Sequence, residues 1–167
     1  GCTGLTSVTI PGSVKSMGAS AFYGCSSLAS VIISEGVTYI GDNAFNGCTG
    51  LTSVSIPESV TSIGSYAFNG CTELTSIRIP NSVKRIGNYA FNGCTGLKEV
   101  HISDIAAWCN IEFSGGANPL YYAKNLYLNS ELITDLIIPD GITDIKDETF
   151  RGCSSLTSVT IPNSVTS

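Results

Sequence analysis

Residues 51–73 have the sequence LTSVSIPESVTSIGSYAFNGCTE, and residues 74–96 repeat it as LTSIRIPNSVKRIGNYAFNGCTG. The pattern extends in both directions with a period of 23 residues, because the leucines that open successive units are Leu5, Leu28, Leu51, Leu74 and Leu97. One such unit cannot bury its apolar side chains alone, whereas stacked units share a continuous core. The sequence therefore predicts a solenoid in which each turn is one repeat.

Each unit divides into a strand and a return segment. In the first unit Leu5, Val8 and Ile10 are predicted to point into the core, while Ser7 and Thr9 between them face outward. A proline follows the strand in several units, and it ends the ladder because it has no amide hydrogen to donate. The return segment contributes further core positions, which in this unit are Val14, Met17, Ala21, Phe22 and Cys25.

Glycines recur at fixed positions in the return segment. We expect Gly18 and its equivalents Gly41, Gly64 and Gly87 either to adopt a positive φ or to allow a close approach of backbones. The pairs Asn46-Gly47, Asn69-Gly70 and Asn92-Gly93 are predicted turns that lead back toward the next strand.

The unit L-x-x-V-x-I-P…I-G-x-x-A-F-x-G-C resembles the BspA-type leucine-rich repeat, a family known from surface proteins of anaerobic bacteria and some protists. The resemblance covers nearly the whole chain. It implies a right-handed, curved solenoid with a parallel sheet on its concave side and short irregular or β return segments on its convex side. It also implies an extracellular or cell-surface location and adhesion to a host matrix protein or to another cell.

We expect residues 1–167 to form one solenoid. Regular units span 5–96, an irregular unit with an insertion spans 97–132, and recovered units span 133–167. Residues 1–4 match the tail of a unit and residues 161–167 match only the first part of one, and neither end carries the polar cap that solenoids normally have. We therefore expect the sequence to be a stretch of a longer array, in which an N-terminal signal would not be visible.

The composition excludes several classes of protein. Hydrophobic residues make up 43% of the chain and charged residues only 13%, which argues against a disordered segment. The net charge is −5 and the sequence pI is about 4.6, and no basic stripe is present to neutralise phosphates, so nucleic acid is not an expected partner. No apolar run approaches the roughly 20 residues that cross a bilayer, so this segment is not expected to insert into a membrane.

Six of the seven cysteines occupy one position of the repeat, and Cys109 lies outside it in the irregular unit. A zinc site would need paired Cys-x-x-Cys or mixed Cys and His spacing, which is absent. Equivalent side chains in stacked units lie about 5 Å apart, which is within reach of a disulfide. They point the same way rather than at one another, however, so we expect buried free thiols that act as small hydrophobic groups. The six are Cys2, Cys25, Cys48, Cys71, Cys94 and Cys153.

The irregular unit contains the only Trp, the only His and three of the seven Tyr of the chain. Ser103 or Asp104 can cap a short helix over residues 105–109, and residues 114–119 are predicted loop. Residues 120–122 and 125–128 follow, with a hairpin turn predicted at Asn129-Ser130 before the next strand. Trp108 and the tyrosines, Tyr121 and Tyr122 among them, either pack against the solenoid or form part of a recognition surface.

No cofactor site and no catalytic site are expected. The one available nucleophile and base are Cys109 and His101, with Asp104 as the group that would orient them, but His101 faces outward while Cys109 belongs to a helix predicted to be buried. No signature of a serine hydrolase, a zinc protease or a phosphate-binding loop occurs. The carboxylates Asp144, Asp147 and Glu148 are expected on a solvated face.

The outward strand positions differ from unit to unit, unlike the core positions. One outward column contains Thr9, Ile32, Ser55, Arg78, His101, Ile137 and Thr160. The neighbouring column contains Ser7, Ser30, Ser53, Ser76, Glu99, Asp135 and Ser158. Arg78, Glu99 and His101 stand out chemically against the serines, and with Trp108, Tyr121 and Tyr122 they are the candidate partner-binding residues.

Two functions remain open at this level. The first is a non-catalytic interaction or adhesion module of a bacterial cell-surface or secreted protein, as the resemblance implies. The second is a passive spacer in a larger secreted protein whose other domains carry the activity. The patch of Arg78, Glu99 and His101 favours the first.

Overall fold

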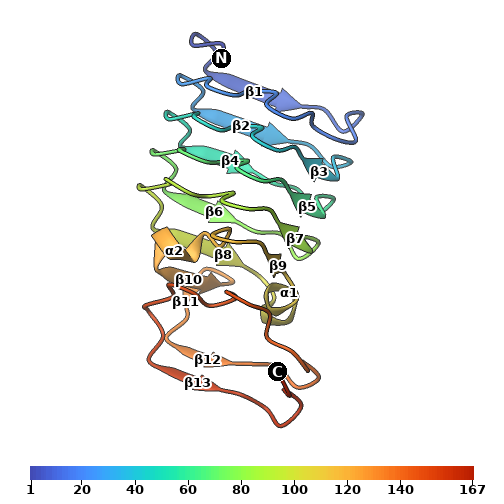
Figure 1. The fold of residues 1–167 in the computed structure, drawn as a ribbon, viewed down its shortest axis with the longest axis vertical. Coiled ribbons are helices and arrows are strands. Elements are labelled where there is room, and N and C mark those ends of the chain that lie inside the picture. The colour runs from blue at the N-terminus through green and yellow to red at the C-terminus, as the bar shows by residue number, and fades with distance from the viewer.

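A computed structural model describes residues 1–167, which form a solenoid of parallel strands (Figure 1). On one side of the solenoid the equivalent strands of successive repeats pair in parallel, so Ser7 pairs with Ser30 and Ser30 with Ser53. This confirms the predicted solenoid and its register. The strands of the first five repeats are β1 (Ser7–Ile10), β2 (Ser30–Ile33), β4 (Ser53–Ser55), β6 (Ser76–Arg78) and β8 (Glu99–Ile102).

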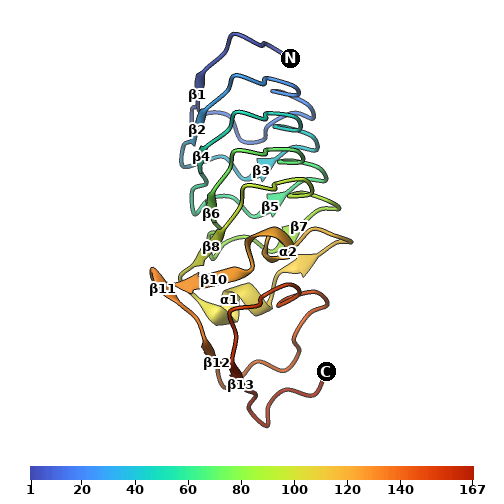
Figure 2. The same ribbon diagram turned by 90° about the vertical axis from the view of Figure 1, so that its left-hand side faces the viewer.

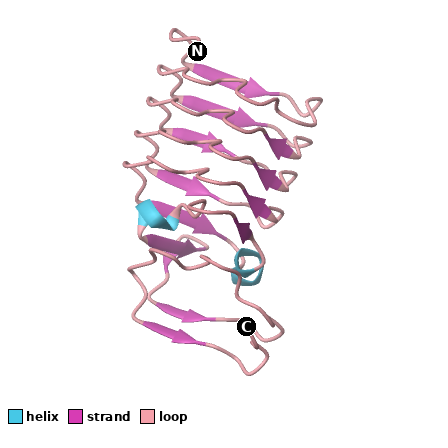
Figure 3. Cartoon of the chain, viewed as in Figure 1, coloured by secondary structure: helices cyan, strands magenta, loops and turns pink.

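The return segments also form a parallel sheet. In the second to fourth repeats the Val-x-x-Ile-Gly stretch contributes two residues, and Ile40 pairs with Ile63, then Ile63 with Ile86. The first repeat adds only a single bridge, from Ser16 to Tyr39. Figures 2 and 3 show this second row of short strands beside the first. Its members are β3 (Tyr39–Ile40), β5 (Ser62–Ile63), β7 (Arg85–Ile86) and β9 (Glu112–Phe113).

The core is built from equivalent side chains stacked on one another. Phe45, Phe68 and Phe91 are at most 1% exposed, and their ring centroids lie 5.4 and 5.3 Å apart in stacked geometry. Phe22 continues the stack at 5.5 Å but is only half-buried, because its ring stacks on a phenylalanine on one side only. Fully burying one such ring contributes about 1.5–3 kcal/mol, so the interior repeats are the most strongly held.

Gly41, Gly64 and Gly87 allow a close approach of backbones, as one of the two alternatives predicted, whereas for Gly18 both are wrong, since a Cβ there would meet nothing within 4 Å. Their φ values are not positive, but a Cβ on Gly41 would lie 2.5 Å from the Met17 carbonyl oxygen, and one on Gly64 would lie 2.6 Å from the Asp42 nitrogen. Successive turns therefore touch backbone to backbone at this position. The Asn-Gly pairs do form turns, and their glycines have φ values of 74°, 70° and 75° at residues 47, 70 and 93.

The cysteines are free thiols, as predicted, and the ladder is buried at Cys25, Cys48, Cys71 and Cys94. The expected burial is wrong for Cys2, which is exposed, and holds only in part for Cys153, while Cys109 is buried outside the ladder. The Cys48 Sγ donates to the Phe22 carbonyl oxygen at 3.1 Å, and the Cys94 Sγ donates to the Phe68 carbonyl oxygen at 3.1 Å. Burial raises the pKa of Cys48 to about 11 and that of Cys94 to about 12. These thiols therefore stay protonated and act as small packing groups that also satisfy a carbonyl.

The irregular segment contains two short helices, α1 (Ile105–Cys109) and α2 (Leu120–Ala123). Of the two predicted caps Asp104 is the one used, since its carboxylate accepts from the Ala106 and Ala107 amides at 2.7 and 3.1 Å. Two further strands, β10 (Asn125–Leu128) and β11 (Glu131–Leu132), are joined by the predicted turn at Asn129-Ser130 and pair in antiparallel fashion.

Strand β10 stacks directly on β8 as the next strand of the main row, with Leu126 opposite Val100. The insertion therefore supplies an extra strand to the sheet face. The last two strands, β12 (Asp135–Ile137) and β13 (Ser158–Thr160), pair with each other in parallel further along the coil (Figure 1).

Candidate functional site

The candidate site lies on the outward face of strands β6, β8 and β10. Alternation along a strand sends Ile77 and Val100 into the core and sends their neighbours Arg78 and His101 outward. The strands pair in register, so Arg78 lies opposite His101 and His101 lies opposite Tyr127. Three chemically distinct side chains thus occupy consecutive positions of one column. We call these residues, together with Glu99, the sheet-face patch.

Tyr127 corrects the order of the outward column that the sequence suggested. The expected neighbour of His101 was Ile137, and that of Glu99 was Asp135, but β10 places Tyr127 and Asn125 at those positions. The physical reason is that the insertion forms an extra strand of the sheet rather than a loop outside it. A signal was available in Asn125-Leu126-Tyr127-Leu128, where apolar residues alternate with outward ones as in a strand.

His101 lies at the centre of the patch and contacts both Glu99 and Tyr127. Its Nε2 lies 2.9 Å from the Glu99 Oε2, and its ring stacks on that of Tyr127 with centroids 4.9 Å apart. The His101 side chain is 27% exposed and that of Glu99 is 43% exposed, so both stay accessible from outside. The ring pair provides a flat, amphipathic surface with a carboxylate beside it.

Arg78 is oriented by the loops that follow the strands. Its Nη2 lies 3.4 Å from the Glu58 Oε1 and 3.5 Å from the Ser103 Oγ. Glu58 is held in turn because its Oε2 accepts from the Asn81 amide at 3.1 Å. The Arg78 side chain remains 54% exposed, so its guanidinium keeps donors free for a partner.

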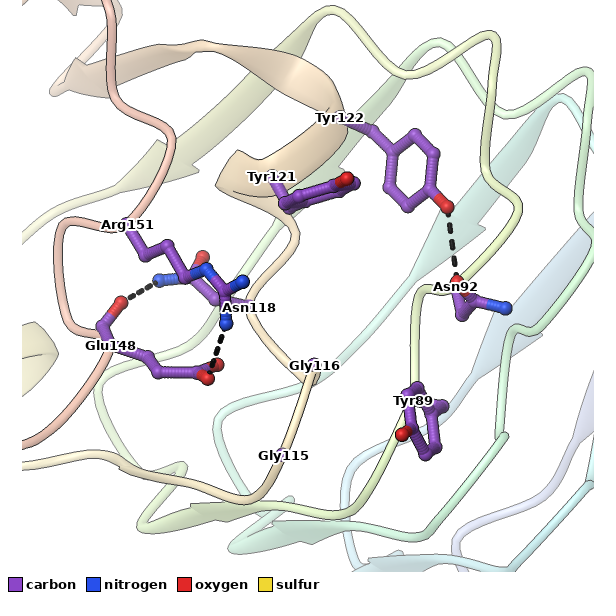
Figure 4. Close-up of a pocket in the computed structure, with 9 residues that line it drawn as sticks. All are labelled: Tyr89, Asn92, Gly115, Gly116, Asn118, Tyr121, Tyr122, Glu148 and Arg151. Carbon is purple, nitrogen blue, oxygen red and sulfur yellow. Dashed lines mark hydrogen bonds and ion pairs between the residues drawn. The ribbon is translucent and has the colours of Figure 1, made fainter.

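The other predicted site residues lie elsewhere. Trp108 is 1% exposed, and its Nε1 donates to the Thr149 carbonyl oxygen at 3.0 Å, so it is a core residue and is not available to a partner. The expectation that Trp108 contacts a partner is therefore wrong, because helix α1 directs the indole into the core. Tyr121 and Tyr122 belong to helix α2, where with Tyr89 they line a pocket of about 430 Å³ (Figure 4).

The groups considered for catalysis are not arranged for it. Cys109 is buried, and desolvation raises its pKa to about 11, so the thiol is not a nucleophile at neutral pH. Asp104 is used in capping helix α1. Asp144 pairs with Lys146, which lowers the pKa of that carboxyl through their hydrogen bond, and Glu148 pairs with Arg151 at 2.6 Å.

No group of three or more His, Cys, Asp or Glu side chains converges in a way that could hold a metal ion. Neither helix combines the length and the apolar character that a membrane span requires.

Comparison with known proteins agrees with this architecture. The family described as the BspA type leucine rich repeat region matches residues 1–115 and 122–167, in six copies. No curated protein sequence matches the chain significantly.

Solved structures of leucine-rich repeat proteins are similar to the chain. The leucine rich repeat protein of T. pallidum (TpLRR) is 27% identical with a TM-score of 0.64, over 93% of this chain and 69% of that one. The pneumococcal vaccine antigen PcpA is 26% identical with a TM-score of 0.62, over 95% of this chain and 35% of that one. A leucine-rich repeat protein from Bacteroides capillosus is 29% identical with a TM-score of 0.55, over 60% of this chain and 79% of that one. The chain thus spans about a third of the pneumococcal antigen.

Proposed function

The chain belongs to the BspA-type leucine-rich repeat family, and from this we propose that it is a non-catalytic module that binds a partner protein through its sheet-face patch. The observation that carries the proposal is the column of Arg78, His101 and Tyr127, which lie side by side on three paired strands. Arginine and tyrosine are among the residues that most often dominate the energy of protein interfaces. A rigid ladder of strands presents them without a large entropic cost of ordering.

The surroundings of the patch support a localised interaction. The adjacent outward positions on β1, β2, β4 and β6 are serines, which present a hydrated surface without anchors. Glu58 and Glu99 flank Arg78 and His101, so the patch carries charges of both signs within a short distance. Such an arrangement favours a partner of complementary charge pattern over general adhesion to a charged surface.

We further propose that the module acts outside the cell, as an adhesive segment of a surface or secreted protein. The family membership supports this location, and the pneumococcal relative is described as a vaccine antigen, which agrees with exposure to the exterior. A host matrix protein or the surface of another cell is the expected partner.

The test is capture of purified extracellular-matrix proteins by the immobilised chain at physiological salt. We expect capture of a specific matrix protein, and we expect Arg78→Ala combined with His101→Ala and Tyr127→Ala to weaken it at least about tenfold. The matched control is Thr9→Ala with Ser55→Ala in the same outward column. Unchanged capture by the triple variant, at an unchanged melting temperature, would place binding elsewhere. No capture by the folded wild-type chain would favour a passive spacer.

A further inference from the structure

One backbone position of the return segment repeatedly adopts the left-handed conformation. Tyr66 and Tyr89 have φ values of 57° and 54°, which is uncommon for a bulky side chain, and their rings stack with centroids 5.4 Å apart. The Tyr66 amide donates to the Asn88 carbonyl oxygen, and the Tyr89 amide donates to the Gly115 carbonyl oxygen. Gly116, with a φ of 65°, therefore follows Tyr89 in this column of stacked turns.

Gly116 leaves a notch in that column, because a side chain is absent where the two preceding repeats carry tyrosine. The notch is bordered on one side by Tyr89 and Asn92 and on the opposite side by Glu148 and Arg151, and helix α2 lies above it (Figure 4). The resulting pocket has a volume of about 430 Å³, within the range of small-ligand sites. It is built from turns and helix α2, so it is distinct from the sheet-face patch.

The aromatic walls are accessible and carry unused hydroxyl groups. Tyr121 is 50% exposed and Tyr89 is 45% exposed, and neither hydroxyl is hydrogen-bonded within the protein. Tyr122 packs edge-on against Tyr121, with ring centroids 5.1 Å apart. Its hydroxyl donates to the Asn92 Oδ1 at 3.0 Å, which fixes the amide and leaves the Asn92 Nδ2 free to donate.

The charged wall of the pocket is an ion pair in which one carboxylate oxygen is unpartnered, because the Glu148 Oε2 is buried and accepts no hydrogen bond. The Arg151 Nη1 lies 2.6 Å from the Glu148 Oε1, and the Arg151 guanidinium also lies 5.8 Å from the centre of the Tyr121 ring. Lys124 approaches the same ring at 5.0 Å. These two cations exclude a cationic ligand from Tyr121 and cover part of that ring, whereas the Tyr89 ring lies beside Gly116, which carries no side chain. Asn118 offers little to a ligand, because its Nδ2 donates to the Glu148 and Thr149 carbonyl oxygens and its Oδ1 accepts from the Leu120 amide.

We propose that this pocket binds a pyranose unit of a neutral glycan. A pyranose has a face of C–H groups, which are attracted to the negative face of an aromatic ring, and a rim of hydroxyls that both donate and accept. The pocket presents both features, with accessible tyrosine rings and with the hydroxyls, the Asn92 amide and the Glu148–Arg151 pair around them. A purely apolar ligand would leave these polar groups unpaired, and a peptide anchor would need a deeper desolvated hole.

The proposal is tested by saturation-transfer difference NMR on the full chain. The probes are methyl β-glucopyranoside, methyl β-galactopyranoside and methyl N-acetyl-β-glucosaminide. We expect transfer to the ring protons of at least one glycoside, with a dissociation constant in the millimolar range, weakened about fivefold in Tyr121→Ala. Tyr23→Ala is the matched control, since Tyr23 is a 53% exposed tyrosine outside the pocket.

A second variant removes a polar group from the pocket wall and leaves the backbone of the notch unchanged. Asn92 is exposed and lines the pocket, so Asn92→Leu is expected to fold and to weaken glycoside binding by removing the free Nδ2 donor. Three results would overturn the proposal: absence of glycoside binding by the folded wild-type chain, glycoside binding that persists unchanged in Tyr121→Ala and Asn92→Leu, or binding of arginine amide in place of the glycosides.

Discussion

The aromatic stack makes a quantitative prediction about where stability resides. Phe68 is 0% exposed and lies between two phenylalanine rings at 5.4 and 5.3 Å, whereas Phe22 is half-buried and has one such neighbour at 5.5 Å. Replacing a core phenylalanine with alanine costs about 3–5 kcal/mol. We therefore expect Phe68→Ala to lower the free energy of unfolding by about 4 kcal/mol. Phe22→Ala loses less buried area and one ring contact, so we expect a loss of about half as much.

The assay is urea unfolding of both variants and the wild type, followed by circular dichroism for the whole coil and by Trp108 fluorescence for the irregular segment. Trp108 is buried and therefore reports on the packing of that segment. Equal losses for the two variants, or a loss below about 2 kcal/mol for Phe68→Ala, would refute the idea that neighbouring repeats determine the stability of each turn.

Three further predictions concern thiols, capping and backbone contact. At pH 8 iodoacetamide is expected to alkylate the exposed Cys2 readily. Cys94 is buried and has a pKa of about 12, so at pH 8 its thiol is protonated and should stay unmodified until urea is added. Rapid labelling of all seven thiols in the folded chain, measured by mass spectrometry, would contradict this. Asp104→Ala removes the acceptor for two amides of helix α1 and should cost about 1 kcal/mol in urea unfolding, whereas Asp104→Asn should cost less. Gly64→Ala places a Cβ 2.6 Å from a backbone nitrogen and should lower the unfolding free energy by about 1–3 kcal/mol. Gly4→Ala is the control, since a Cβ on Gly4 meets nothing within 4 Å and should leave the unfolding free energy unchanged. Similar effects of the two variants would show that successive turns do not touch at Gly64.

Much of the fold follows from the spacing of residues in the repeat. Equal spacing places Leu28, Leu51 and Leu74 in equivalent environments, and all three are 0% exposed. The glycines show where local sequence stops being sufficient, because either a positive φ or a backbone contact could explain Gly41. Only the stacking of neighbouring turns decides between them.

The composition of the candidate site was harder to predict from the sequence, because the site includes the irregular segment in which the 23-residue period is interrupted. The position of Tyr127 depends on whether the insertion forms a loop or a strand, and that is decided by pairing with β8 rather than by the repeat. The left-handed backbone at Tyr89 has no local signal either, since tyrosine disfavours it and the ladder to the next turn imposes it. The inward position of Trp108 involves a hydrogen bond from its indole to the Thr149 carbonyl oxygen, a partner 41 residues away that local sequence does not indicate.

The most direct test of the proposed binding face is site-specific photo-crosslinking to a captured matrix protein. The photoreactive residue p-benzoylphenylalanine would replace His101 in the sheet-face patch or, as the control, Tyr39 on β3 of the second sheet. The account predicts crosslinks to the partner from position 101 and none from position 39. Crosslinks from position 39 alone would show that the chain presents a different face to its partner and would contradict the account.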